Sequence, residues 1–133
     1  MEIPYLIKYQ ITGSSDLGYL NISEVGKNIP FEVKRVFWTH SLPNGIIRGF
    51  HAHKNTKQIL IAIKGKIKVT TEMPDGTIST FNLEESNVGV YLPPNVWHTM
   101  EYNDDAIQLV FCSELYSEID YIRDYNDFKT YYK

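Results

Sequence analysis

The sequence of 133 residues lacks the features that mark several large classes of protein. Cys112 is its single cysteine, which excludes an intramolecular disulfide and a cluster of thiolate metal ligands. Apolar residues precede it at 109–111, so we expect a reduced thiol in the core. No signal-peptide pattern opens the chain, and no apolar run approaches the roughly 20 residues that cross a bilayer. We therefore expect a soluble, cytoplasmic protein with no membrane partner.

Positive charge is also scarce. The chain has 13 Lys and Arg against 16 Asp and Glu, a formal net charge of −3, and no basic run. This composition provides no electrostatic footprint for nucleic acid, which we exclude as a general partner. Linkers, internal repeats and low-complexity segments are missing too. The length suits a single domain spanning residues 1–133.

Short stretches rich in β-branched and aromatic residues make up most of the chain, and Gly, Pro and Asn separate them. The predicted strands cover residues 3–10, 18–23, 31–39, 48–53, 58–63, 66–72, 77–83, 88–92, 96–101 and 106–112. Only the tail, from about 117 to 132, spaces its apolar residues three to four apart, which is typical of a helix. The pattern predicts an all-β fold, a jelly-roll β-barrel with a short C-terminal helix.

Two histidines, His51 and His53, lie two residues apart in the predicted strand 48–53. Because side chains alternate across a strand, both imidazoles project from the same face. Arg48 precedes His51 by three residues, and ideal alternation places it on the opposite face. A shared site therefore requires a bulge at Gly49 or a position for Arg48 at the mouth of the strand. The pattern indicates a site that either binds a metal or moves a proton.

The spacing of glycines, histidines and a proline resembles the two-part signature of the cupin superfamily, small jelly-roll barrels with a site in the cavity. The matching residues are Gly45, His51, His53, Gln58, Gly65, Gly89, Pro93 and His98. In metal-binding cupins the ligands are three histidines and a glutamate, and here Gln58 occupies the glutamate position. A neutral amide does not neutralise the charge of a divalent cation. His51, His53 and His98 could still form a three-histidine site, but the set is incomplete and we expect no metal and no other cofactor.

Longer segments resemble one cupin group, the dTDP-4-keto-6-deoxyglucose 3,4-ketoisomerases, also called the FdtA-like or WxcM-like family. These segments are residues 48–54 with Gln58, residues 89–94 with Trp97 and His98, and residues 120–128. The likeness runs from about residue 31 to 129. Near the start, relatives often carry Asp-x-Arg-Gly-x-Leu, whereas residues 16–20 of this chain contain no arginine.

The resemblance implies an isomerase that moves the ketone of a dTDP-linked 4-keto-6-deoxy sugar from C4 to C3. A base removes the C3 proton, an enediolate forms, and C4 is reprotonated. Histidine has an ordinary pKa near 6.5, which suits such a base. We expect His51 to be the C–H base and His53 its partner or the shuttle between the two oxygens. Arg48 is the candidate for stabilising the enediolate or binding the diphosphate.

Five other residues are candidates for contacts with the substrate. Tyr91 or Trp97 could stack on thymine, although core packing suits either equally well. Arg35 could contact phosphate, and Gln58 could orient a histidine or bind a sugar hydroxyl. For His98 a role in the site and a structural role are equally compatible with the sequence.

The resemblance also implies a homodimer, in which strand 3–10 could be exchanged between chains. The product would supply a PLP-dependent aminotransferase that makes a 3-amino-3,6-dideoxy sugar for a surface glycan or a glycosylated metabolite. Three alternatives stay open: a dTDP-sugar 3,5-epimerase, a metal-dependent cupin dioxygenase, and a non-catalytic sugar-nucleotide sensor. The epimerase needs a base paired with a carboxylate, and no acidic residue is adjacent to His51 in the sequence.

Overall fold

The computed structural model describes residues 1–132, and most of these residues lie in strands. The strands are β1 (Tyr5–Lys8), β2 (Gln10–Ser14), β3 (Gly18–Ile22), β4 (Arg35–Thr39), β5 (Ile47–His53), β6 (Gln58–Glu72), β7 (Ile78–Leu83), β8 (Val88–Leu92), β9 (Trp97–Cys112) and β10 (Tyr121–Ile122). A 3-10 turn (Glu118–Asp120) and helix α1 (Tyr125–Tyr131) complete the chain. Neither this helix nor any other part of residues 1–132 offers a helix suited to crossing a membrane.

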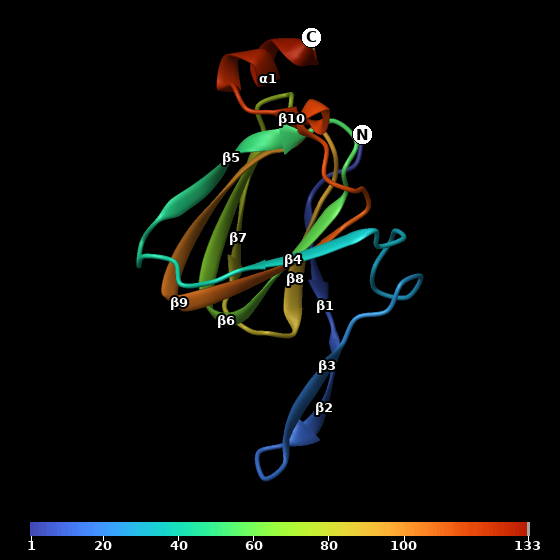
Figure 1. The fold of residues 1–133 in the computed structure, drawn as a ribbon, viewed down its shortest axis with the longest axis vertical. Helices are drawn as coiled ribbons and strands as arrows, with labels where there is room; N and C mark the ends of the chain where they lie inside the picture. Colours follow the sequence, from blue (N-terminus) through green and yellow to red (C-terminus); the bar gives the residue numbers. More distant parts are fainter. Residues whose placement is uncertain (133) are drawn as a thin grey trace.

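The two longest strands, β6 and β9, bend and take part in both layers of the fold (Figure 1). The first half of β6 pairs with β8 and with the second half of β9. Its second half pairs with β7 and with the first half of β9. Strands β1 and β4 extend the first layer, and β5 and β10 extend the second. This is the predicted jelly-roll arrangement, although the hydrogen-bonded ladder within residues 1–132 does not close into a continuous barrel.

The prediction of separate strands at 58–63 and 66–72, and again at 96–101 and 106–112, was wrong. Gly65 (φ 74°) on β6 and Asp104 (φ 57°) and Asp105 (φ 55°) on β9 adopt the left-handed conformation in the middle of continuous strands. These residues bend the chain by local irregularities in register and do not end its pairing. A Cβ on Gly65 would lie 2.6 Å from the Asp104 carbonyl oxygen, so only glycine fits where the two strands cross.

Other predicted boundaries shifted as well. Residues 3–10 are divided between β1 and the start of β2, and only Arg35–Thr39 of the stretch 31–39 is a strand. The tail becomes helical only at Tyr125, because the Asp124 carboxylate accepts a hydrogen bond from the Asp127 N–H and caps the helix there. Residues 118–122 instead form the 3-10 turn and β10.

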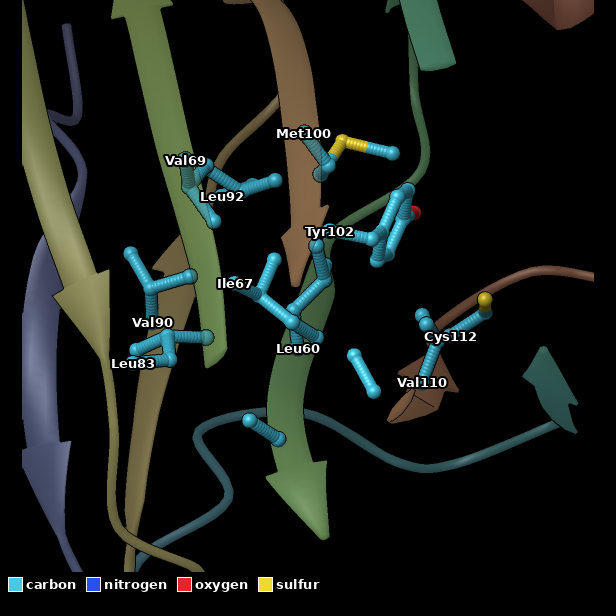
Figure 2. Close-up of a cluster of buried hydrophobic side chains, with 12 residues drawn as sticks. Leu60, Ile67, Val69, Leu83, Val90, Leu92, Met100, Tyr102, Val110 and Cys112 are labelled. Atoms are coloured by element: carbon cyan, nitrogen blue, oxygen red, sulfur yellow. The ribbon is translucent and has the colours of Figure 1, made fainter. Parts of the chain in front are cut away.

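The core lies between the two layers, and Figure 2 shows side chains from β6, β8 and β9 meeting there. Along β6, Leu60 and Ala62 point into this core, whereas Ile59 and Ile61 point to the outer face and pack in a second cluster with Tyr91. Burial of both faces explains the continuous apolar run in this strand. Cys112 is a buried free thiol in the main core, as predicted.

Helix α1 packs near the end of the jelly roll where β5 ends. Its Phe128 forms a small buried cluster with Ala52 of β5, Trp97 of β9 and Ile122 of β10. The β2–β3 hairpin extends from the opposite end, away from both layers (Figure 1). Helix α1 and β10 therefore hold the end of β5, which carries the histidines.

Candidate active site

A cavity of about 430 Å³ opens between the layers, beside the core. Its apolar wall includes Phe37, Leu60, Met100 and Val110. Its polar lining includes Arg48 and His51 of β5, Gln58 of β6, His98 and Gln108 of β9, and Tyr121 and Arg123 from the β10 segment. An apolar cavity with a few convergent polar groups is the usual form of a small-molecule site.

A β-bulge, one of the two arrangements that the sequence left open, brings Arg48 and His51 into the same cavity. Gly49 (φ 100°) and Phe50 (φ 55°) are both left-handed, and the register of β5 on β9 shifts between Gly49 and His51. A Cβ on Gly49 would lie 2.8 Å from the His98 carbonyl oxygen, so the bulge depends on glycine at this position. The extra residue reverses the alternation, and Arg48 and His51 therefore share the cavity.

Three histidines lie together here: His51 of β5 and His98 of β9 line the cavity, and the buried His53 of β5 lies next to them but is not part of the lining. The His51 ring centroid lies 5.0 Å from that of His53 and 4.6 Å from that of His98, both in edge-on orientations. The rings of His53 and His98 are 6.0 Å apart. The register pairs His51 directly with His98. The structure therefore places His98 in the site.

The hydrogen bonds of the three histidines assign one tautomer to all of them. Nδ1 lies 3.0 Å from the Gly49 carbonyl oxygen in His51 and 3.1 Å from the Val96 carbonyl oxygen in His98. In His53 it lies 2.8 Å from the Asp120 carboxylate. Each partner can only accept, so each Nδ1 carries the proton and each Nε2 keeps a lone pair. The Nε2 of His53 is buried and has no hydrogen-bond partner in residues 1–132.

The sequence interpretation assigned no role to Asp120, which anchors His53. Its carboxylate also accepts hydrogen bonds from the Thr56 hydroxyl and, at 2.6 Å, from the Asn55 N–H. Burial raises the pKa of Asp120, but these hydrogen bonds and the one from His53 outweigh it and lower the pKa overall. An ionised carboxylate thus fixes the tautomer and orientation of His53. Asp120 is held next to His53 because the following residue, Tyr121 of β10, pairs with His53 of β5.

Burial keeps the three imidazoles neutral near pH 7. Burial, and then repulsion from His53, lowers the pKa of His51 from 6.5 to about 4. Burial also lowers the pKa of His53, although the Asp120 hydrogen bond and charge oppose it. The pKa of the fully buried His98 falls well below its ordinary value for the same reason. All three Nε2 atoms can therefore accept a proton or bind a cation.

Tyr121 and Arg123 also line the cavity, and the sequence interpretation missed both. The Tyr121 ring lies 4.4 Å from that of His53 and 5.0 Å from that of His51. The Arg123 guanidinium lies 4.2 Å from the Tyr121 ring centre and forms a two-pronged ion pair with Glu118. Both residues lie in the segment 120–128 that carried the resemblance, and that was the only signal in the sequence.

The remaining predicted residues differ in position. Gln58 lines the cavity, and its amide donates to the Cys112 sulfur at 3.5 Å. Arg35 is not part of the lining and lies 5.6 Å from the ring centre of Phe37. Tyr91 is buried in the outer cluster, and Trp97 packs against Phe128 beneath α1. Neither aromatic ring lines the cavity formed by residues 1–132, and the stacking of either ring on thymine stays a prediction.

Comparison with known proteins agrees with the resemblance seen in the sequence. The model of the protein family described as FdtA: WxcM-like, C-terminal, matches residues 4–133. A TDP-4-oxo-6-deoxy-alpha-D-glucose-3,4-oxoisomerase from Aneurinibacillus thermoaerophilus is 40% identical over 116 residues, which cover 86% of this chain and 82% of that protein.

Solved structures give the same relationship. The sugar 3,4-ketoisomerase QdtA from Thermoanaerobacterium thermosaccharolyticum, in complex with TDP, is 35% identical with a TM-score of 0.88, covering 95% of this chain and 91% of that one. The TDP-fucose-3,4-ketoisomerase WlaRA from Campylobacter jejuni is 30% identical with a TM-score of 0.86, covering 95% of this chain and 93% of that one.

Proposed function

The chain belongs to the FdtA family of WxcM-like proteins and is a TDP-sugar 3,4-ketoisomerase, and we propose that its histidines carry the proton transfers. The substrate is a dTDP-4-keto-6-deoxyhexose and the product the corresponding 3-keto sugar. The observation that carries this proposal is a cluster of three neutral imidazoles with unprotonated Nε2 atoms, of which His51 and His98 line the cavity and the buried His53 lies directly beside them.

His51 is the base in this proposal. It lines the cavity, and its Nε2 accepts the C3 proton while the C3–H electrons form the C3–C4 double bond of the enediolate. A pKa of about 4 makes the free imidazole a weak base. The negative charges of the diphosphate and of the developing enediolate favour the imidazolium and raise its pKa as the reaction proceeds.

His53 moves the hydroxyl proton from O3 to O4 in this scheme, which leaves the ketone at C3. The buried Nε2 has no other partner in residues 1–132, and Asp120 holds its ring in the tautomer that can accept there. Asp120 acts through His53 and is a positioning residue. The proton held on His51 exchanges with solvent, and the imidazolium then protonates C4, which restores both imidazoles.

Arg48 supplies positive charge to the enediolate or to the diphosphate. It lines the same cavity as His51, whereas Arg123 is already engaged by Glu118. A donor aimed at developing negative charge contributes roughly 2.7–4 kcal/mol in comparable enzymes. Gln58, also in the lining, is placed to bind a sugar hydroxyl. No step is assigned to a metal, because Gln58 occupies the position of the carboxylate ligand and a neutral amide does not neutralise the charge of a divalent cation.

One observation favours the alternative of a 3,5-epimerase. That reaction needs a base paired with a carboxylate, and the fold brings Asp120 to His53, although not to His51. Both reactions begin with a 4-keto sugar, but they exchange hydrogens on different carbons of the sugar with solvent. The carbons that acquire solvent hydrogen therefore distinguish a ketoisomerase from an epimerase.

The test is to incubate EDTA-treated protein with dTDP-4-keto-6-deoxyglucose in deuterated water and follow C3 and C4 by NMR. Ketone migration with deuterium at C4 is expected, and replacing His51 by Asn should abolish it. Deuterium at C3 and C5 without migration would indicate an epimerase. Substrate binding without exchange would indicate a sensor. Stoichiometric iron, manganese, nickel or zinc that turnover requires would contradict the metal-free scheme.

The product defines the next reaction in the proposed pathway. Transamination places nitrogen on a carbon that carries a ketone, so a 3-keto sugar suits a PLP-dependent aminotransferase that makes a 3-amino-3,6-dideoxy sugar. A coupled assay with such an aminotransferase should yield amino sugar only when this chain is present.

We also propose a homodimer formed through the β2–β3 hairpin. Strand β1 pairs with β8 of its own chain, whereas the hairpin exposes Ile11, Tyr19 and Leu20. A second copy would cover these apolar side chains. Light scattering should report a dimer for the natural protein and a monomer after Leu20→Lys, and a monomeric natural protein would contradict the proposal.

A further inference from the structure

Gln108 and Tyr102 form a buried pair in the cavity that the proposed proton transfers do not use. Both residues line the cavity and come from β9, one from each half of the strand. The Tyr102 hydroxyl donates to the Gln108 side-chain oxygen at 2.9 Å. Burial raises the pKa of Tyr102 to about 12, although the positive charge of Arg48 opposes this rise. The phenol therefore stays protonated and keeps its role as donor.

This hydrogen bond fixes the direction of the Gln108 carboxamide. A buried phenol has to donate its proton, and within residues 1–132 the Gln108 oxygen is the only hydrogen-bond partner of the Tyr102 hydroxyl. In the reversed carboxamide an N–H would meet the hydroxyl and leave the phenol proton unpaired, which is costly in a buried site. The Gln108 NH2 group makes no hydrogen bond within residues 1–132 and is not fully enclosed, so it faces the cavity.

Two further donors lie beside this pair. Thr39 of β4 pairs directly with Gln108 and lines the cavity. Arg48 of β5 pairs with Met100, so its side chain is a diagonal neighbour of Tyr102 on the same face. A guanidinium can only donate, and the carboxamide oxygen is already occupied. We call this part of the cavity, formed by Thr39, Arg48, Tyr102 and Gln108, the donor end, and it suits a ligand group that only accepts hydrogen bonds.

The other end of the cavity has the opposite character. His51 and His98 carry unprotonated Nε2 atoms there. Gln58 donates its NH2 group to the Cys112 sulfur at 3.5 Å, which leaves its side-chain oxygen for the cavity. Gln108 and Cys112 are four residues apart on β9, so the two ends are separated by roughly 13 Å along the strand. Acceptors at this second end suit the hydroxyl groups of a sugar.

We propose that Gln108 is a specificity residue whose amide, held in place by Tyr102, donates to the diphosphate of the substrate next to Arg48. This assignment rests on the proposed function. C4 of a pyranose lies across the ring from C1, so a sugar with C3 and C4 at the histidines directs the diphosphate on C1 towards the donor end. Phosphate oxygens only accept hydrogen bonds. Arg48 is exposed whereas Gln58 and His98 are buried, so the donor end also leads outwards to the nucleoside.

Calorimetry with dTDP on the full chain tests this contact without turnover. Gln108→Glu still accepts from the Tyr102 hydroxyl but replaces the donor by a charged oxygen, and should raise the Kd of dTDP roughly 10- to 100-fold. Tyr102→Phe is a smaller change that releases the carboxamide, and should raise the Kd roughly 3- to 10-fold. In turnover assays KM should rise by similar factors while kcat is retained, because the diphosphate does not react.

Two variants with the same exchange of an amide for a carboxylate serve as controls. Asn82→Asp makes this change on the exposed face of β7, outside the cavity, and should bind dTDP as the natural protein does. Gln58→Glu makes it inside the cavity at the acceptor end, and should weaken dTDP binding less than Gln108→Glu does, because the added charge is beyond the screening length from the donor end.

An unchanged Kd in both Gln108→Glu and Tyr102→Phe would overturn the assignment, as would equal effects of Gln108→Glu and Gln58→Glu or weakened binding in Asn82→Asp. A fall in kcat without a rise in the Kd of dTDP would reduce the pair to a structural role and would overturn it too. A natural protein that binds dTDP through Gln108 but moves no ketone in the deuterium experiment would contradict only the proposed function. The two failures are therefore distinct.

Discussion

Lowering the pH from 7.5 to 5.0 should destabilise the fold through its buried histidines. The pKa of His51 is about 4 in the folded protein against 6.5 ordinarily, because the half-buried ring loses solvation and lies next to His53. Between these two pKa values, His51 therefore binds a proton in the unfolded chain but stays neutral in the folded chain. The stability from the neutral ring is complete above pH 6.5 and is lost as the pH falls from there towards 4.

The size of the effect follows from the same two values. The difference between the two pKa values of His51 corresponds to about 3 kcal/mol of the free energy of unfolding. About 2 kcal/mol of this stability is lost by pH 5.0. His53 and His98 shift in the same direction, so the total loss exceeds this amount. The window lies above the ordinary pKa range of Asp and Glu, roughly 4, so carboxylates contribute little.

The assay is urea unfolding at pH 7.5 and 5.0, followed by circular dichroism. The natural protein should lose about 2 kcal/mol more free energy of unfolding across this window than His51→Asn. His40→Gln should behave like the natural protein, because the fourth histidine is exposed. Equal losses in the natural protein and in His51→Asn would refute the conclusion that the His51 ring is neutral.

Three further predictions concern single residues. Asp120→Asn should lower kcat roughly 100-fold or more with little change in KM, because His53 loses its tautomer and orientation; an unchanged kcat would show that the carboxylate has no part in proton transfer. Arg48→Met should lower kcat roughly 100- to 1,000-fold if it faces the enediolate, whereas a rise in KM alone would assign it to the diphosphate. Gly49→Ala should lower the free energy of unfolding by about 1–3 kcal/mol. Gly76→Ala, which shares the positive φ but meets no atom within 4 Å, should cost less in the same urea assay.

Local pattern was sufficient to predict the strands but not how they join. Alternation and turn residues located the strand-forming stretches, including Val88–Leu92 with its bounds. The continuity of β6 across Gly65, and of β9 across residues 103–105, depends on pairing between these two strands. A glycine or an Asp-Asp pair ends a strand in one context and bends it in another, and the partner strand decides which.

The site was predictable wherever its residues are close in sequence. The alternation rule placed His51 and His53 on one face, and the mismatch at Arg48 required either a bulge at Gly49, which the structure has, or a position at the mouth of the strand. The contact of Asp120 with His53 could not be predicted from local spacing, because the two residues are 67 positions apart in the sequence. Nothing in its neighbourhood distinguishes it from the other acidic residues of the tail.

The sequence alone determined the all-β class, the family and the pair of histidines, because each depends on short spacing that any strand preserves. Tertiary structure decided what surrounds the histidines. Pairing of β10 with β5 brings Asp120 and Tyr121 to them, and pairing of β9 with β5 adds His98. Burial of Tyr91 and Trp97 keeps both aromatic rings out of the cavity. These outcomes depend on contacts between distant segments, whose free energy is not encoded in any single stretch of the chain.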